Sequence, residues 1–172
     1  IIKLDSAAMS ANTYVNRFNF LDMASSWALT MGGQILMSHY LGAGEIDKVK
    51  KTYWKIASII CSFAFIVYLV IVLAPHFFIS FFTTDSLIIS LSIPLLFVAL
   101  VLEPVRAVNV LGGVALKTVG DGRFSVVVSL IFMWGLVPVL IACVALGGGL
   151  ISVWVSLLAD EVIRAIINIW RW

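Results

Sequence analysis

The sequence predicts an all-α fold, a polytopic bundle of about five transmembrane helices, and two observations lead to this prediction. The 172 residues are 62% hydrophobic and only 12% charged, with a mean hydropathy of +1.12, whereas a soluble domain usually carries about 25% charged residues. Apolar runs recur along the chain at lengths close to the roughly 18 residues that indicate a helix crossing a bilayer. The whole chain, 1–172, is therefore expected to be one transmembrane region surrounded by lipid.

Five spans are expected, separated by turn signals. The first is a long, mildly amphipathic helix that stops at a Gly-Ala-Gly run. The second has nineteen consecutive residues without a charge and stops before Pro75. The third leads to a Gly-Asp-Gly turn, and three glycines separate the fourth span from the fifth. The region between the second and third spans, 75–86, is expected to be a loop. The predicted spans are 7–41, 56–74, 87–116, 124–146 and 150–170.

Lysine and arginine fall on alternate connections. Residues 42–55 contain four, residues 117–123 contain two, and the C-terminal end adds two when Arg164 is counted, whereas 75–86 and 147–149 contain none. Because basic loops stay in the cytoplasm, the chain is expected to be a multi-pass protein of the cell membrane. Its N-terminus would lie outside and its C-terminus in the cytoplasm. A net charge of +2 gives no indication of a nucleic-acid partner.

Polar residues recur along the first helix at spacings of three and four, which places them on one stripe. The stripe consists of Asn12, Asn16, Asn19, Met23, Ser26, Thr30 and Gly33. Arg17 and Asp22 lie five residues apart and are expected to point to different sides. A polar stripe on a membrane helix predicts that the helix lines a cavity, and Asn12, Asn16, Asn19 and Ser26 are its candidate lining residues.

The third span contains an ionisable pair. Glu103 and Arg106 lie three residues apart on one helix face, and Asn109 continues that face one turn further. A charge at the centre of a bilayer costs about 2.5–3.5 kcal/mol on insertion scales. Two interpretations stay open, namely a self-neutralising structural pair and a wet surface where a cation or proton is exchanged. Pro104 favours the second, because it frees a backbone carbonyl where transport helices often bend.

The fifth span holds a second charged cluster, Asp160, Glu161 and Arg164, whose spacings of four and three allow ion pairs on one face. Its place in the cytoplasmic half of the span predicts a structural role.

The sequence lacks the usual enzyme signatures. It contains no GxSxG or HExxH motif, no phosphate-binding glycine loop with lysine and no Cys/His ligand cluster. Cys61 and Cys143 lie in apolar runs and are expected to be packing residues. We therefore expect no enzyme, no metal site and no cofactor.

Several short motifs occur in an order that is similar to that of a known family. The motif residues are Gln34, Leu41-Gly42-Ala43-Gly44, Glu103-Pro104, Arg106-Ala107, Asn109, Leu116, Gly120-Asp121, the run 149–154, Asp160-Glu161, Arg164 and Arg171-Trp172. Together they resemble the C-terminal half of bacterial multidrug and toxic compound extrusion (MATE) transporters, and the likeness covers nearly the whole chain.

The resemblance implies a secondary transporter of twelve helices in two six-helix lobes. Such proteins export amphipathic or cationic small molecules, drugs and toxins among them, by antiport with Na⁺ or H⁺. The five spans would be helices eight to twelve, so the chain would be a piece of a longer protein and the N-terminal lobe its missing partner. Glu103 would then respond to the coupling ion and Arg106 would control its ionisation. The family's own acidic position on this helix aligns near Arg106, one turn away from Glu103.

Other functions are compatible with an apolar chain of this kind. A lipid-linked oligosaccharide flippase of the same superfamily would need a strongly basic cavity, and the arginines inside the spans are few. A non-transporting membrane subunit or scaffold would use the charged pairs only to lock helices together. A membrane-embedded hydrolase is the least favoured, because no nucleophile and base are paired.

Overall fold

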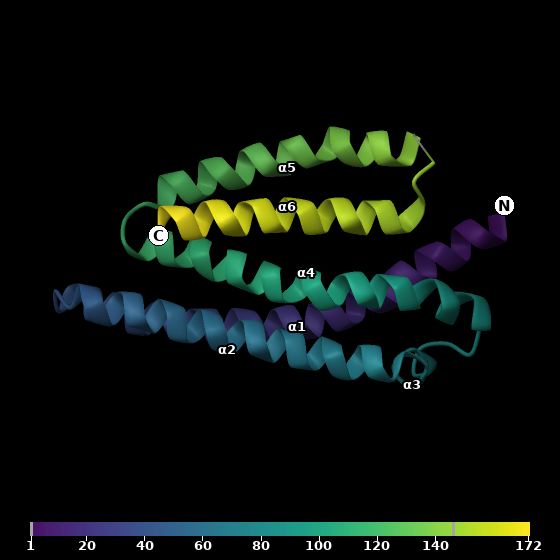
Figure 1. Cartoon of the computed structure of the whole chain (residues 1–172), viewed down its shortest axis with the longest axis horizontal. Helices are drawn as coiled ribbons and strands as arrows, with labels where there is room; N and C mark the ends of the chain where they lie inside the picture. Colours follow the sequence, from purple (N-terminus) through teal and green to yellow (C-terminus); the bar gives the residue numbers. More distant parts are fainter. Residues whose placement is uncertain (1, 146) are drawn as a thin grey trace.

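The structure, a computed structural model, describes residues 2–145 and 147–172 (Figure 1). Ile1 and Leu146, the last residue of the predicted fourth span, lie outside the described residues. The described chain forms helices and no strand, which confirms the predicted all-α fold. The helices are α1 (Ile2–Gly42), α2 (Ile46–Leu73), α3 (Pro75–Ser80), α4 (Ser86–Thr118), α5 (Gly122–Ala145) and α6 (Gly149–Arg171).

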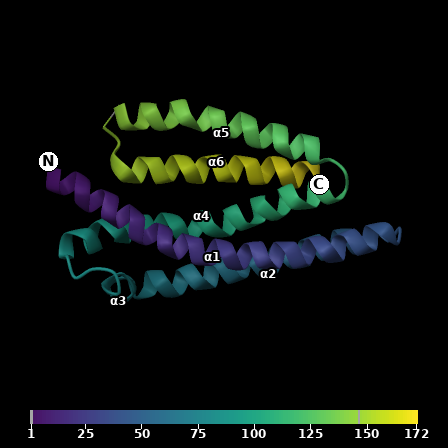
Figure 2. The same cartoon turned by 180° about the vertical axis from the view of Figure 1, so that it is seen from behind.

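Helix α4 is the central element of the bundle. It packs against α1 and α2 on one side and against α5 and α6 on the other, as both views show (Figures 1 and 2). A helix that is apolar around most of its circumference is expected to be buried among others, and α4 follows this rule. In one apolar cluster Leu95, Leu96 and Leu102 of α4 pack with Val15 and Tyr68.

Glycines end the helices where the sequence predicts turns. Gly44, after α1, and Gly120, after α4, have φ values of 75° and 91°, a left-handed conformation that glycine adopts without steric cost. Helix α2 ends at Leu73, two residues before Pro75. At the start of α4 the carboxylate of Asp85 accepts a hydrogen bond of 2.9 Å from the backbone N–H of Leu87, which caps the helix.

The predicted loop at 75–86 contains helix α3, so that prediction was incomplete. Pro75 occupies the first turn of α3, where its fixed φ favours a helix. Two of the aromatic side chains that follow contact α1, because the rings of Phe78 and Phe82 pack edge-on against Phe18 at centroid distances of 6.2 and 5.4 Å. Helix α1 also begins earlier than expected, at Ile2 instead of residue 7.

Three of the described helices are long and apolar enough to cross a membrane, namely α2, α4 and the part of α5 from Gly122 to Cys143. Helices α1 and α6 are also long, but they carry the polar and charged stripes. The count of five spans therefore stays a prediction.

The structure gathers the basic connections at one end of the bundle. The α1–α2 turn, the α4–α5 turn and the C-terminus lie together at the left of Figure 1, and the N-terminus and the α5–α6 turn lie at the right. The lysines and arginines of residues 42–55 and 117–123 therefore share one end with Arg171. We call it the basic end.

Candidate functional site

The ionisable pair on α4 lies deep in the bundle. Glu103 is 1% exposed, and its Oε1 accepts a hydrogen bond of 2.5 Å from Nη1 of Arg106. The two side chains share one face of α4, as their spacing predicts. Pro104, which is also buried, lies beside them inside the helix and has no N–H to donate to the carbonyl of Leu100, four residues earlier. The pair thus lies where the α-helical hydrogen bonding is locally incomplete.

Arg106 and Asn109 also contact the charged cluster on α6. Nε of Arg106 lies 3.4 Å from Oε1 of Glu161, and Nδ2 of Asn109 donates to Oε2 of the same residue at 2.6 Å. Asn168 in turn donates to Oδ1 of Asn109 at 2.6 Å. The two charged groups that the sequence presents 55 residues apart therefore form one network between α4 and α6.

The α6 cluster forms the ion pairs that its spacing predicts. Arg164 is paired with the carboxylate of Asp160, and its Nη2 lies 3.2 Å from Oε1 of Glu161. Glu161 is thus shared by two guanidinium groups and one amide. Such shared contacts hold α6 against α4 at the level of Arg106.

Asp22 of α1 is a further buried acid, and the sequence analysis did not choose it. It is 3% exposed, and its Oδ1 has no hydrogen-bond partner within the part of the chain that the structure describes. The hydroxyl groups of Ser26 and Thr30, further along the same face, are also buried without a described partner. Buried polar atoms are nearly always paired, so this face of α1 is a candidate for binding an ion, a proton or a further polar group.

Asp22 and Glu103 face one small space between α1 and α4. Ser26 and Arg106 also line it, and its volume is about 10 Å³, which is close to the volume that one water-sized sphere needs. The space would accommodate a single small ion or water molecule, and two carboxyl groups and one guanidinium border it.

Asp22 also borders a much larger groove between α1 and α2. The groove has a volume of about 480 Å³, and its walls include Phe18, Phe63 and Phe78. Aromatic walls with one acidic group are chemically suited to an organic cation, because the ring faces and the carboxylate both attract positive charge. Asp22 thus lies between a space large enough for one ion and a groove large enough for a small organic molecule.

The residues of the predicted polar stripe on α1 do not line one common cavity, and they contact several different elements. The carbonyl of Asn12 accepts a hydrogen bond of 3.0 Å from the indole of Trp154, and that of Asn19 accepts one from Tyr68. Asn16 is exposed, whereas Ser26 lines the small space beside Glu103. Of these four candidates only Ser26 reaches the acidic space. Met23, which the predicted stripe included, is 37% exposed.

The signal for Asp22 was present in the sequence. The buried face of α1 runs through Asn19, Asp22, Ser26, Thr30 and Gly33 at spacings of three and four. Four of these five residues also belong to the predicted stripe. The difference is that the buried face contains Asp22 where the predicted stripe had Met23.

Comparison with known proteins adds the following findings. The MatE family model matches residues 1–144. The chain is 28% identical over 176 residues to the uncharacterized transporter YisQ of Bacillus subtilis (strain 168), an alignment that covers 98% of this chain and 38% of that protein. It also superposes on the solved structure of the MATE transporter ClbM in complex with Rb⁺, with a TM-score of 0.83 and 18% identity over 99% of this chain and 40% of that one. The chain therefore spans about two fifths of the length of these proteins.

Proposed function

The chain belongs to the MATE family of membrane transporters, and on that premise we propose that it contributes the cation-coupling half of an exporter of amphipathic cations. Family membership supports the general part of this proposal, namely that the chain is part of a multi-pass membrane protein whose relatives are transporters. The finer part, antiport against Na⁺ or H⁺, is our proposal, and the contacts around Glu103 support it.

The main support for the proposal is that the buried carboxyl groups outnumber the guanidinium groups that pair with them. Four carboxyl groups, those of Asp22, Glu103, Asp160 and Glu161, are buried in the described chain, and two guanidinium groups, those of Arg106 and Arg164, pair with three of them. When all are ionised, two negative charges remain uncompensated in apolar surroundings. An unpaired buried charge is strongly unfavourable, and on this ground we propose that the site takes up protons or cations. A site with that requirement can couple an ion gradient to a conformational change.

The contacts of Arg106 suggest how binding is transmitted. Its guanidinium lies between two carboxylates, 2.5 Å from Glu103 and 3.4 Å from Glu161. A cation or proton that neutralises Glu103 weakens the first contact and leaves the second as the stronger one. Arg106 would then move towards α6, and α4 would shift relative to α1. In this proposal Asn109 follows the same movement through its hydrogen bond to Glu161.

The groove between α1 and α2 supplies a place for the exported molecule. We assign the amphipathic substrate to the aromatic walls of that groove, with its positive charge near Asp22. Since Asp22 also borders the space at Glu103, substrate and coupling ion would compete for the same carboxylate. Competition of this kind is what an antiporter requires. The monovalent Rb⁺ held by ClbM, a protein of the same fold, is compatible with a monovalent coupling ion here.

The basic end of the bundle is assigned to the cytoplasm by the same charge rule that the sequence suggested. The N-terminus of this segment would then lie outside.

The oligosaccharide flippase finds less support, because both arginines of the network are paired with carboxylates and are therefore not free to bind a pyrophosphate.

The experiment is transport by the full-length protein that contains this chain, reconstituted in liposomes with a Na⁺ or a pH gradient. Export of a fluorescent organic cation should fall at least about tenfold for Glu103→Gln and Asp22→Asn, the change that corresponds to losing about 1.4 kcal/mol of ion binding. Asp47→Asn is the matched control, because Asp47 is exposed at the basic end and has no ion pair in the described chain. Undiminished transport by Glu103→Gln would remove Glu103 from the mechanism.

A further inference from the structure

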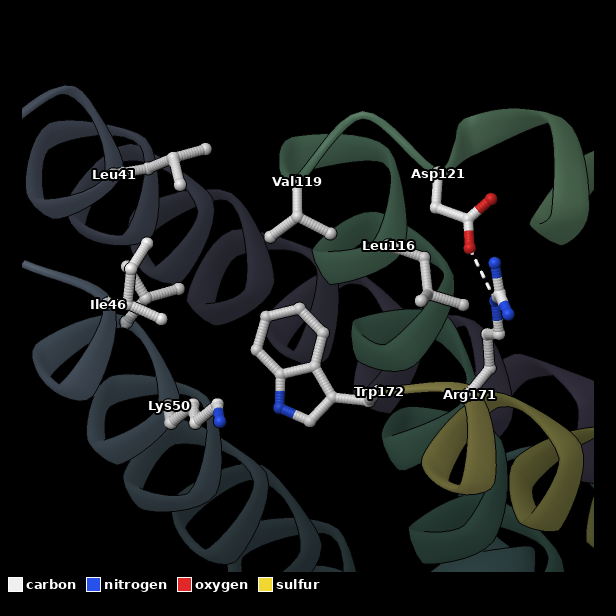
Figure 3. Close-up of a pocket in the computed structure, with 9 residues that line it drawn as sticks. Leu41, Ile46, Lys50, Leu116, Val119, Asp121, Arg171 and Trp172 are labelled. Atoms are coloured by element: carbon white, nitrogen blue, oxygen red, sulfur yellow. Dashed lines mark hydrogen bonds and ion pairs between the residues drawn. The ribbon is translucent and has the colours of Figure 1, made fainter. Parts of the chain in front are cut away.

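A pocket of about 400 Å³ opens at the basic end, far from the acidic space on α4. It lies where the end of α1, the start of α2, the end of α4 and the end of α6 meet (Figure 3). Leu41, Ile46 and Val119 form an apolar wall, and Lys50, Arg171 and Trp172 bring donor groups to the same space. Neither the family assignment nor the proposed coupling mechanism uses this pocket.

Two of the donors have no acceptor within the described residues. The ammonium group of Lys50 forms no ion pair or hydrogen bond there, although Lys48, one half-turn earlier, is paired with Glu45 at 2.7 Å. The indole N–H of Trp172 is buried and also lacks a partner in the described chain. Figure 3 shows the indole nitrogen on the side of the ring that faces Lys50. A cationic and a neutral donor, neither of them paired within the described residues, thus line the same space.

The third donor is held in place. Nε of Arg171 donates to Oδ2 of Asp121 at 2.6 Å, and the guanidinium lies 5.2 Å from the centre of the Phe124 ring. This pair neutralises the side-chain carboxylate of Asp121, which lines the pocket, so Asp121 does not repel an anion as a free acid would. The indole of Trp172 is fixed in turn by its packing on Tyr53, with ring centroids 4.6 Å apart.

The surroundings restrict the kind of anion that fits. The pocket combines an apolar wall with cationic groups at the ends of membrane helices, which is the level where lipid headgroups lie. Basic pockets between helices on the cytoplasmic side bind the headgroups of anionic lipids. We infer that this pocket binds the phosphate of an anionic phospholipid, with Lys50 and the Trp172 indole donating to the phosphate oxygens and the acyl chains lying along the apolar wall.

The test is native mass spectrometry of the full-length protein, delipidated in detergent, with added phosphatidylglycerol or phosphatidylcholine of identical acyl chains. Phosphatidylglycerol should bind more tightly than phosphatidylcholine. A basic residue near a membrane surface contributes enough attraction to change binding about fivefold, so Lys50→Gln should weaken phosphatidylglycerol binding by about that factor. Trp172→Phe should weaken it too, because the substitution replaces the indole, with its N–H, by a single phenyl ring that cannot donate a hydrogen bond.

Lys51→Gln is the matched control. Lys51 is the next residue on α2, is exposed and does not line the pocket, so it changes the net charge equally. Equal affinity for the two lipids, or equal losses in Lys50→Gln and Lys51→Gln, would overturn the proposal. Displacement of phosphatidylglycerol by inorganic phosphate in large excess would assign the pocket to soluble phosphate and would overturn the lipid assignment. Binding is measured here without transport, so failure of this inference is distinguishable from failure of the proposed function.

Discussion

The two faces of α4 differ in how their buried polar groups are partnered. Towards α6, every carboxyl group is bound by a guanidinium or an amide, and Glu161 alone is contacted by Arg106, Asn109 and Arg164. Towards α1, Asp22, Ser26 and Thr30 each present a buried oxygen that has no partner in the described chain. The paired face fixes two helices in one arrangement, whereas the unpaired face has the unsatisfied groups that a binding site needs. Stability and ion binding should therefore respond to different substitutions.

The largest effect on stability should come from Arg106→Met in the full-length protein. The substitution leaves Glu103 and Glu161 buried without their shared guanidinium, and breaking a buried pair in this way costs about 3–5 kcal/mol. Thermal unfolding in detergent would show a strongly lowered midpoint temperature. A midpoint within experimental error of the unmodified protein would mean that the paired face does not hold the bundle together.

A smaller loss is expected for Glu161→Gln. Its carboxylate accepts from Asn109 and lies beside two arginines, and an amide replaces charge-assisted hydrogen bonds by weaker ones. Hydrogen bonds to charged groups contribute about 1.5–3 kcal/mol, and part of that should be lost. The matched comparison is Asp22→Asn on the unpaired face, measured by the same thermal unfolding. If Asp22→Asn were the more destabilising of the two, the contrast between the faces would be wrong.

Joint replacement of Glu103 and Arg106 by leucine distinguishes transport from a scaffold role. Replacing a buried ion pair by apolar residues is often neutral or stabilising, so the unfolding midpoint should stay close to that of the unmodified protein. Export of the fluorescent cation should nevertheless be lost, because the coupling carboxylate is gone. Retained export in a stable double variant would favour the scaffold and contradict the proposed coupling.

The smallest change in stability is expected for Asp22→Asn without added cation, because no described partner is lost. Its effect should be visible only when the coupling cation is added. A ligand at one hundred times its dissociation constant stabilises a folded protein by about 2.7 kcal/mol, and the unmodified protein should show such a rise in midpoint temperature with Na⁺ or at lower pH. The variant should lose most of that rise, with Asp47→Asn as the unaffected control.

The sequence predicted the fold class and most of the charged residues, because hydropathy and helical spacing are local properties. Glu103, Arg106 and Asn109 share the expected face, and Asp160 and Glu161 pair with Arg164 as their spacing suggests. The joining of the two clusters could not be predicted, since it depends on how α4 and α6 pack across more than 50 residues of chain. Spacing alone predicts neighbours within one helix and says nothing of contacts between helices.

Asp22 was missed for a different reason. Residues 22 and 23 are adjacent on the helix, and both continue a pattern of threes and fours through Asn19 and Ser26. The packing of α1 on α4 decides between them, because it buries Asp22 and leaves Met23 partly exposed. Helix α3 was missed because Pro75, which ends the preceding span, is typical of a loop as well as of a helix start, and the packing of Phe78 on Phe18 depends on the tertiary structure.

The central claim is that water and the coupling ion reach the space between Asp22 and Glu103. The most direct test is thiol labelling of Ser26→Cys, a residue that lines this space, in full-length protein whose other cysteines are replaced by alanine. We expect a small water-soluble thiol reagent to label position 26. Na⁺ at constant pH should slow this labelling, or lower pH should slow it more than it slows labelling at position 38, since lower pH reduces the thiolate fraction of any cysteine. A thiol at position 26 that stays unlabelled under every gradient, while one at exposed Ser38 reacts, would contradict the account.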